Sequence, residues 1–179
     1  MDKYISRYRR ALNPDQCRSL ILHHDLMSVE GNNYDEVRSY WYVPGEWNFF
    51  PYLKEVLIKN LDKYVDKHNF LHTWGYGWGV DDDFNMQKYD PGKGYVGEHC
   101  EACANTSKRV VAWMFYLNDI RNKGGTRWPQ QNFTARPRAG DLYIWPAAWT
   151  HSHYGIPAPK ETKYIITGWA SFDGDNRWE

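Results

Sequence analysis

His99 and Glu101, two residues with metal-binding side chains, are separated by a single position. On an extended strand, residues i and i+2 project from the same face, so this imidazole and this carboxylate could bind one ion. A histidine from a distant segment would complete a facial triad of two histidines and one carboxylate. Such a triad leaves positions open for a bidentate co-substrate and for oxygen. The pattern therefore indicates an Fe(II) site, because oxygen activation needs a metal that changes its oxidation state.

The third ligand has two candidates, because the segment Thr150-His151-Ser152-His153 places two histidines on one face if it is extended. The residues alone leave this choice open. His-x-Glu by itself is also a weak signal, and a solvated strand pair is the simple alternative. The remaining histidines have no partner at ligand spacing, and we predict structural roles for them: His23, His24, His68 and His72.

Cys100 and Cys103 form a Cys-x-x-Cys pair beside His99, a spacing that also occurs in zinc sites and redox pairs. A closed zinc site usually has four ligands from two such clusters, and the sequence contains no second cluster. Strand alternation also predicts that Cys100 faces away from His99. Together with Cys17, the cysteines number 3, which argues against a disulfide framework and for a reducing compartment.

The elements that would position these residues are mainly strands. From about residue 72, short aromatic and β-branched runs alternate with turn clusters such as Asp81-Asp82-Asp83. Their spacing favours a sandwich or barrel. The candidate strands are 73–80, 84–89, 95–100, 109–117, 126–128, 142–145 and 163–172.

Residues 1–71 are predicted to be mostly helical. Asn13 supplies a cap and Pro14 a first-turn proline, and a second apolar helical pattern covers residues 51–67. We expect these helices to pack on one outer face of the strands. The predicted organisation is a single domain over residues 1–179, mainly β (α+β), with its β core in residues 72–179.

Composition restricts the classes of partner. The chain has 22 basic and 22 acidic residues, which weighs against nucleic-acid and membrane-surface binding. Its first ten residues lack the apolar region of a signal peptide, and no stretch approaches a membrane span, so we expect a cytoplasmic protein. The chain has 10 tryptophans, which could pack a core or line a substrate groove. The groove candidates are Trp74, Trp78, Trp113, Trp128, Trp145 and Trp149.

Residues 85–171 resemble the catalytic core of the prolyl 4-hydroxylase-like branch of the 2-oxoglutarate/Fe(II) oxygenases. The matching segments, in order, are YDPGKGY at 89–95, HCE at 99–101, FYLND at 115–119, GGTRWP at 124–129, PRAGD at 137–141, HYGIP at 153–157 and KYIITGW at 163–169. The ordered set is far more specific than any one motif. The resemblance implies a double-stranded β-helix (jelly-roll or cupin-like), which agrees with the strand pattern.

The resemblance also assigns residues. In this family the distal histidine precedes x-Gly-x-Pro, and a basic residue follows about ten positions later, which favours His153 over His151. The resemblance thus implies His99, Glu101 and His153 as iron ligands. It pairs Lys163 with the far carboxylate of 2-oxoglutarate and gives that carboxylate a hydrogen bond from Tyr89. Thr167 and Trp169 are further candidates for lining this pocket.

Glu101 departs from the family, which usually has aspartate there. Its charge is the same, but its side chain is one methylene longer. The implied reaction is hydroxylation of an unactivated C–H bond, with 2-oxoglutarate and O2 converted to succinate and CO2, and with ascorbate as an accessory reductant. The implied substrate is a prolyl residue of a peptide or protein, and a small molecule is the other option. Arg127 and Arg138 could contact it.

Two other readings of the chain compete with this one. A Trp-rich β-sandwich that binds carbohydrate or peptide would need neither the histidines nor the lysine. A cupin-like metalloenzyme that is independent of 2-oxoglutarate would need the triad but not Lys163. The sequence makes no prediction of the oligomeric state.

Overall fold

The computed structural model describes residues 4–27, 29–30, 41–45, 47–73, 77–172 and 175–176. The strands are β1 (Ser6–Tyr8), β2 (Val29–Glu30), β3 (Trp41–Gly45), β4 (Trp78–Tyr89), β5 (Arg109–Tyr116), β6 (Thr126–Trp128), β7 (Phe133–Thr134), β8 (Leu142–Pro146), β9 (Tyr154–Gly155), β10 (Lys163–Phe172) and β11 (Asp175–Asn176). The helices are α1 (Pro14–Met27), α2 (Pro51–Lys67) and α3 (Phe70–Thr73), with short 3-10 turns η1 (Trp47–Phe49), η2 (Ala104–Thr106) and η3 (Trp149–His151).

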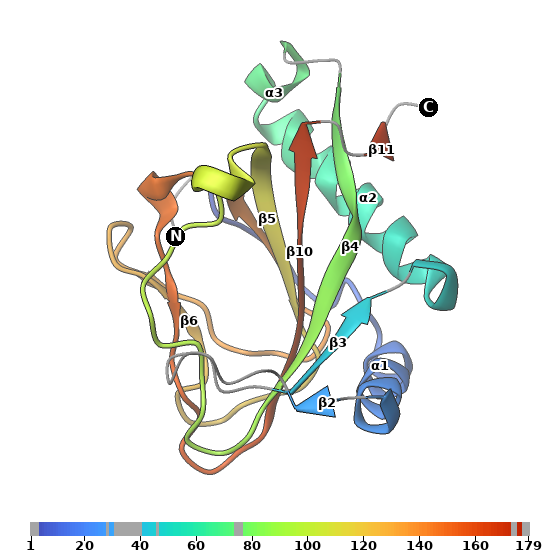
Figure 1. Ribbon diagram of the computed structural model, residues 1–179, viewed down its shortest axis with the longest axis vertical. Coiled ribbons are helices and arrows are strands. Elements are labelled where there is room, and N and C mark those ends of the chain that lie inside the picture. Colours follow the sequence, from blue (N-terminus) through green and yellow to red (C-terminus); the bar gives the residue numbers. More distant parts are fainter. Residues whose placement is uncertain are drawn as a thin grey trace.

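Two antiparallel sheets form the body of the chain. The large sheet has the order β1-β8-β5-β10-β4-β3-β2, with β11 pairing on β4, and the small sheet has the order β7-β6-β9. Helices α1 and α2 lie on one side of the large sheet, and β6 lies on the other side (Figure 1). This is the mainly β arrangement, with helices on one outer face, that the sequence predicts.

The alternation of side chains along the central strands explains this layering. In β5, every second side chain packs under the helices and the others pack between the two sheets, because neighbouring residues of a strand point to opposite faces. The helix side receives Val111, Trp113 and Phe115, and the inner side receives Ala112, Met114 and Tyr116. All of these side chains are buried, so both faces of this strand are apolar.

Both predicted long helices are confirmed. Helix α1 begins at Pro14 after a reciprocal cap, in which the Asn13 side chain accepts from the N–H of Gln16 and the Gln16 side chain accepts from the N–H of Asn13, both at 2.9 Å. Helix α2 covers the predicted residues 51–67 and buries Leu53 and Leu57 against the sheet.

The strands differ from the prediction at three places. The Asp81–Asp83 triplet is not a turn but continues β4, where Asp81 accepts a 3.0 Å hydrogen bond from the hydroxyl of Ser171 on β10. Residues 95–100 are not a regular strand, because within this segment only Tyr95 and His99 are isolated bridge positions. The bridge at His99 is to His153, the residue before β9. Strands β1 to β3 are the third difference, because they lie in residues 1–71, which are predicted to be mostly helical. Strands β1 and β2 are too short to show alternating side chains, and Pro44 weakens the strand signal of β3.

Within the described residues, no helix combines the length and the apolar composition needed to cross a membrane.

Candidate metal and co-substrate site

The two histidines of the predicted triad pair across a narrow antiparallel bridge. The N–H of His99 donates to the carbonyl of His153 at 3.0 Å, and the N–H of His153 donates to the carbonyl of His99 at 2.8 Å. This pairing brings the ring centroids to 4.4 Å from each other. Because the bridge joins two segments more than 50 residues apart, it assembles the site from distant parts of the sequence.

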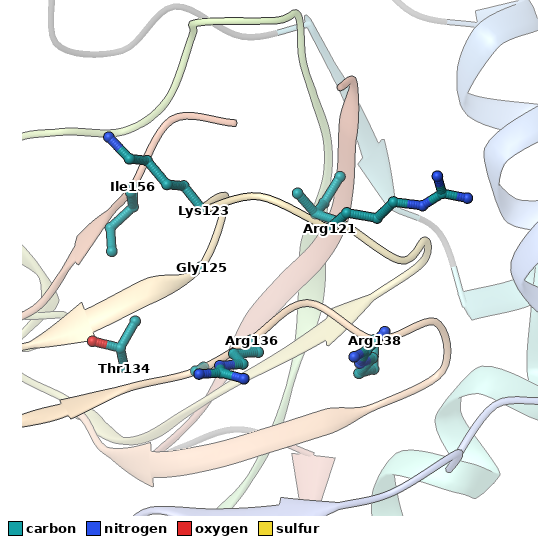
Figure 2. A pocket seen from close by; sticks show the side chains of 9 residues that line it. Arg121, Lys123, Gly125, Thr134, Arg136, Arg138 and Ile156 are labelled. Carbon is teal, nitrogen blue, oxygen red and sulfur yellow. The ribbon is translucent and has the colours of Figure 1, made fainter. Parts of the chain in front are cut away.

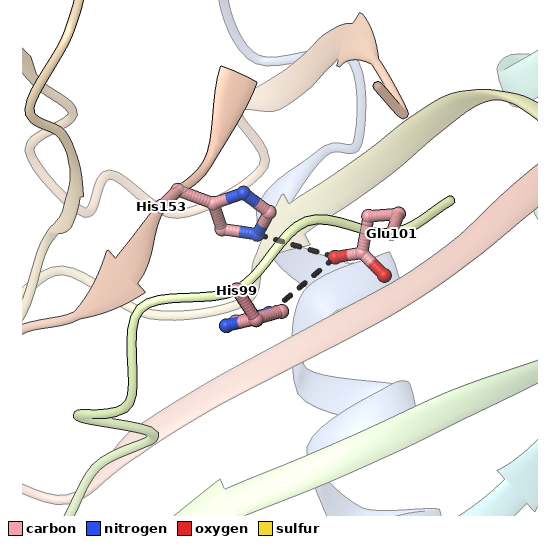
Figure 3. Close-up of side chains that lie close together, drawn as sticks. All are labelled: His99, Glu101 and His153. Carbon is pink, nitrogen blue, oxygen red and sulfur yellow. Dashed lines mark ion pairs between the residues drawn. The ribbon is translucent and has the colours of Figure 1, made fainter. Parts of the chain in front are cut away.

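Glu101 completes the cluster from the same segment as His99. Its Oε1 lies 3.1 Å from Nε2 of His153 and 3.6 Å from Nε2 of His99 (Figure 3). One candidate ligand atom from each of the three residues lies within 4.8 Å of the others. His153 and Glu101 are buried, whereas the His99 side chain is 28% exposed. This cluster matches a facial triad with one open side.

A hydrogen bond at Nδ1, the ring nitrogen remote from Glu101, fixes the tautomer of each imidazole. Nδ1 of His99 lies 2.9 Å from the carbonyl of Gly97, and Nδ1 of His153 lies 3.0 Å from the carbonyl of His151. A carbonyl can only accept, so Nδ1 carries the proton in both rings. The proton that each ring gives up on binding a metal is then the one on Nε2, the atom that faces Glu101, and its loss leaves the lone pair there for the metal.

The Glu101 carboxylate has a separate partner for each oxygen. Trp169 Nε1 donates a 2.7 Å hydrogen bond to Oε2, and Arg109 Nη1 lies 3.7 Å from the same oxygen. The Arg109 guanidinium stacks 3.4 Å from the centre of the Trp169 ring. Burial raises the pKa of Glu101, but the hydrogen bonds and charges of His153 and His99 outweigh it and hold this pKa well below its usual value. The carboxylate is therefore ionised, with Oε1 directed at the histidines.

A pocket of about 600 Å³ extends from the triad to Lys163, which is only 3% exposed. Its Nζ lies 4.5 Å from the centre of the Tyr89 ring. Among the residues that the structure describes, no carboxylate pairs with this ammonium, and burial lowers the pKa of Lys163 to about 8. A buried cation at the end of a pocket favours an anionic ligand.

The other predicted co-substrate residues also line the pocket. The Tyr89 hydroxyl donates to Oε1 of Gln87 at 2.7 Å, and the Thr167 hydroxyl donates to the carbonyl of Trp113 at 3.0 Å. Gln87 and Tyr89 project from the inner face of β4, and Thr167 and Lys163 project from the inner face of β10. The register pairs Lys163 directly with Tyr89, which brings the ammonium and the phenol together.

His151 lies outside this pocket. Its Nδ1 is 3.0 Å from the hydroxyl of Thr150, and its link to the site is the backbone carbonyl that orients His153. The structure thus brings His153, and not His151, to His99 and Glu101. The expectation for Cys100 is wrong, because both Cys100 and Cys103 line the pocket. The alternation of faces does not hold here, because residues 95–100 do not form a regular strand.

The tryptophans have mostly structural roles. Trp78, Trp113, Trp128 and Trp145 are each no more than 1% exposed, and Trp145 also packs its ring edge-on against His153 at 5.1 Å. Trp149 is 70% exposed, and Trp74 lies outside the described residues. Arg109 is the site residue that sequence reasoning missed. Arg109 is the first residue of β5, and a single charged residue at the start of an apolar strand gives no distinctive signal in the sequence.

Comparisons with known proteins agree with this geometry. Residues 84–171 match the family model described as the 2OG-Fe(II) oxygenase superfamily. A protein of Acanthamoeba polyphaga mimivirus, named "Putative prolyl 4-hydroxylase", is 27% identical over 107 residues, which are 49% of this chain and 44% of that protein. The match therefore spans less than half of that relative's length.

Solved structures share the fold. The viral collagen prolyl hydroxylase of Paramecium Bursaria Chlorella virus-1 superposes with a TM-score of 0.74 at 16% identity, covering 94% of this chain and 96% of that one. A Pseudomonas putida prolyl-4-hydroxylase gives a TM-score of 0.71 at 19% identity, covering 96% and 94%. At such identities the likeness concerns the fold, and it confirms the double-stranded β-helix.

The matched segment contains the triad, the buried lysine and the strands that hold them. Over residues 84–171 the chain is similar to the 2OG-Fe(II) oxygenase superfamily. Within it, the comparisons support the prolyl 4-hydroxylase-like branch, as the motifs predict.

Proposed function

We propose that this protein is an Fe(II)- and 2-oxoglutarate-dependent dioxygenase that hydroxylates a prolyl residue of a peptide or protein. The observation that carries the proposal is a pocket with the triad at one end, where both Nε2 atoms face one carboxylate oxygen. Its other end holds buried Lys163, which pairs with no carboxylate of the described residues. A non-catalytic binding module needs neither feature. A cupin-like enzyme independent of 2-oxoglutarate does not need the lysine.

His99, Glu101 and His153 would hold Fe(II). The donor set fits, because two neutral imidazoles and one ionised carboxylate are the ligands of facial iron sites. When bound, the iron supplies the oxygen activation that the protein's own side chains cannot provide. Trp169 keeps the carboxylate in place, and the carbonyls of Gly97 and His151 keep the rings in their ligating tautomer.

Lys163 would pair with the far carboxylate of 2-oxoglutarate. Tyr89 borders the same end of the pocket, because it pairs directly with Lys163, and its hydroxyl would contact that carboxylate. Thr167 lies four residues further along β10, towards the triad, where its hydroxyl would contact the co-substrate. The overall reaction is balanced when one oxygen atom of O2 enters the new hydroxyl group and the other enters succinate, with CO2 released from the 2-oxo acid. The walls of the pocket also include the apolar side chains of Met114 and Ile165, which would limit the water beside the reacting centre once the co-substrate is bound.

The proposal also covers the chain as a whole. We infer one catalytic domain over residues 1–179, acting in a reducing, cytoplasmic setting that suits the free thiols of Cys17, Cys100 and Cys103. The solved relatives include a prolyl hydroxylase of Trichoplax adhaerens in complex with a hypoxia inducible factor peptide, which supports a peptide substrate here. Ascorbate belongs in the assay as the accessory reductant.

A peptide screen tests the function. The protein is incubated with Fe(II), 2-oxoglutarate, ascorbate and a library of proline-containing peptides, and products are measured by mass spectrometry and succinate assay. We expect a gain of one oxygen atom on a prolyl residue, with one succinate for each hydroxylation. The His153→Ala variant and peptides with proline replaced by alanine are the controls. Oxygen gain at other residues only, or on free metabolites only, would contradict the prolyl assignment.

A further inference from the structure

A second pocket, of about 430 Å³, lies outside the metal site and is lined by four basic side chains (Figure 2). These side chains are Arg121, Lys123, Arg136 and Arg138, and we call the pocket that they line the basic groove. All four are exposed. Arg136 and Arg138 lie on one segment, and Arg121 and Lys123 lie on a neighbouring one, so the positive charges line both walls.

The two walls of the basic groove are held together by backbone packing. A Cβ atom on Gly125 would lie 2.0 Å from the carbonyl oxygen of Ala135, so only glycine permits this approach. The N–H of Ala135 donates to the carbonyl of Thr126 at 2.9 Å, and the carbonyl of Gly125 accepts from Ile156 at 2.7 Å. These contacts make the groove a preformed feature, not a chance alignment of long side chains.

The positive charges of the basic groove are barely neutralised within the described residues. Glu161 accepts from the backbone N–H of Arg121 and not from its guanidinium. Among the described residues, the one ion pair of these four side chains joins Arg138 to Asp119 at 4.0 Å, and the two side chains are 55% and 62% exposed. Such an exposed pair contributes little. Arg127 is a useful contrast, because Thr134 and Asn132 already accept its hydrogen bonds. Four like charges around one concavity repel each other until an anion binds.

The basic groove and the metal pocket share one pair of strands. Thr126 and Gly155 pair between β6 and β9 and line the metal pocket, whereas their neighbours Gly125 and Ile156 line the basic groove. A ligand in the groove would therefore lie directly behind the wall of the candidate active site. A partner held there stays close to the active site without occupying it.

We propose that the basic groove is a docking site for an acidic peptide segment, rich in aspartate and glutamate. Guanidinium groups bind carboxylates in a bidentate manner, and three of the four side chains are arginines. Acidic groups border the groove, since Glu161 accepts from the backbone N–H of Arg121 at 3.0 Å and Asp119 lies beside Arg138. Because the net charge of the whole chain is zero, a long nucleic-acid backbone would find few further unpaired cations outside the groove, whereas a short acidic segment needs only these four.

The test uses the full chain without added iron, so that binding is measured apart from any turnover. Fluorescence anisotropy follows a labelled peptide of alternating Glu and Gly, with a Gln-for-Glu peptide of the same length as the neutral control. We expect the acidic peptide alone to bind, and the Arg121→Glu/Arg136→Glu variant to weaken binding at least tenfold. The milder Arg121→Gln/Arg136→Gln variant should weaken it less, and it serves if the charge reversal prevents folding.

The Lys59→Glu/Lys63→Glu variant on α2 is the matched control, because it makes the same change of net charge on exposed residues elsewhere. It should bind the acidic peptide as the unmodified chain does. Equal loss in this control, or equal binding of the neutral peptide, would overturn the proposal. So would tighter, groove-dependent binding of single-stranded DNA of the same charge. A negative peptide screen for hydroxylation leaves this result unaffected, so the two proposals can fail separately.

Discussion

Trp169 donates its indole N–H to Oε2 of Glu101 at 2.7 Å, while Oε1 of the same carboxylate lies 3.1 Å from Nε2 of His153. One oxygen is thus fixed by the protein and the other is directed at the candidate metal position. Arg109 stacks on the Trp169 ring, with its guanidinium 3.4 Å from the ring centre. The arrangement gives a physical role to the longer side chain of Glu101, which reaches both the triad and the last strand.

Replacing Trp169 by phenylalanine should weaken metal binding. The variant keeps an aromatic surface for Arg109 but removes the donor to Oε2, so the carboxylate can rotate. Loss of a hydrogen bond to a ligating residue typically costs about tenfold or more in metal affinity. Calorimetric titration with Co(II) measures this, and Tyr164→Phe is the control. Its hydroxyl lies on the other face of β10, where it contacts Asp25. Unchanged Co(II) affinity in Trp169→Phe would show that the hydrogen bond does not position the ligand.

Replacing Glu101 by aspartate should also weaken metal binding, although aspartate is the usual family residue. The shorter side chain can reach the histidines or Trp169, but not both, in this backbone. We expect Co(II) affinity to fall by about tenfold, with a larger loss in Glu101→Ala. A Glu101→Asp variant that binds Co(II) more tightly than the unmodified chain would contradict the fit of glutamate to this site.

The affinity for 2-oxoglutarate should fall as pH rises above about 8, because burial lowers the pKa of Lys163 to about 8 in the free protein. Below that pH the lysine is already protonated and can pair with the carboxylate. Above it, the lysine must take up a proton on binding, so the affinity decreases by up to about tenfold for each pH unit. Titrations of N-oxalylglycine, a redox-inert mimic, in buffers of different ionisation enthalpy would detect the proton uptake.

Two variants of Lys163 separate charge from shape. Lys163→Met should weaken N-oxalylglycine binding by about 30-fold or more, because removing one partner of a buried charge pair costs about 2 kcal/mol or more. Lys163→Arg keeps a charge that does not titrate in this range, so its affinity should lose the pH dependence. If Lys163→Arg shows the same fall above pH 8 as the unmodified chain, another group is responsible.

The free protein itself should respond to the same titration. The pKa of Lys163 is about 8 in the folded chain and near its ordinary value of 10.5 in the unfolded chain. Between these values the unfolded chain holds one more proton, so the contribution of Lys163 to the free energy of unfolding rises with pH in this window. Denaturant unfolding at pH 7.5 to 10.5 tests this against Lys163→Met, in which the contribution should vanish.

Sequence reasoning predicted the helices α1 and α2, most of the central strands and the three triad residues. These features rest on local patterns, such as the Asn13 cap, or on ordered motifs. It failed at the Asp81–Asp83 triplet, which lies at an irregularity between two paired stretches of β4 and β10, because the pairing on either side keeps the triplet within the strand. It also missed Arg109, whose place beside Trp169 depends on how two strands far apart in the sequence align. Register between distant strands is a tertiary property.

The central claim is that one site holds the metal through His99, Glu101 and His153 and holds 2-oxoglutarate between that metal and Lys163. The most direct measurement is an anaerobic titration of N-oxalylglycine into Fe(II)-loaded protein, repeated with His153→Ala and His151→Ala. We predict one bound N-oxalylglycine for each chain in the unmodified protein and in His151→Ala, and no metal-dependent binding in His153→Ala. Metal-dependent binding that survives in His153→Ala but is lost in His151→Ala would contradict the account.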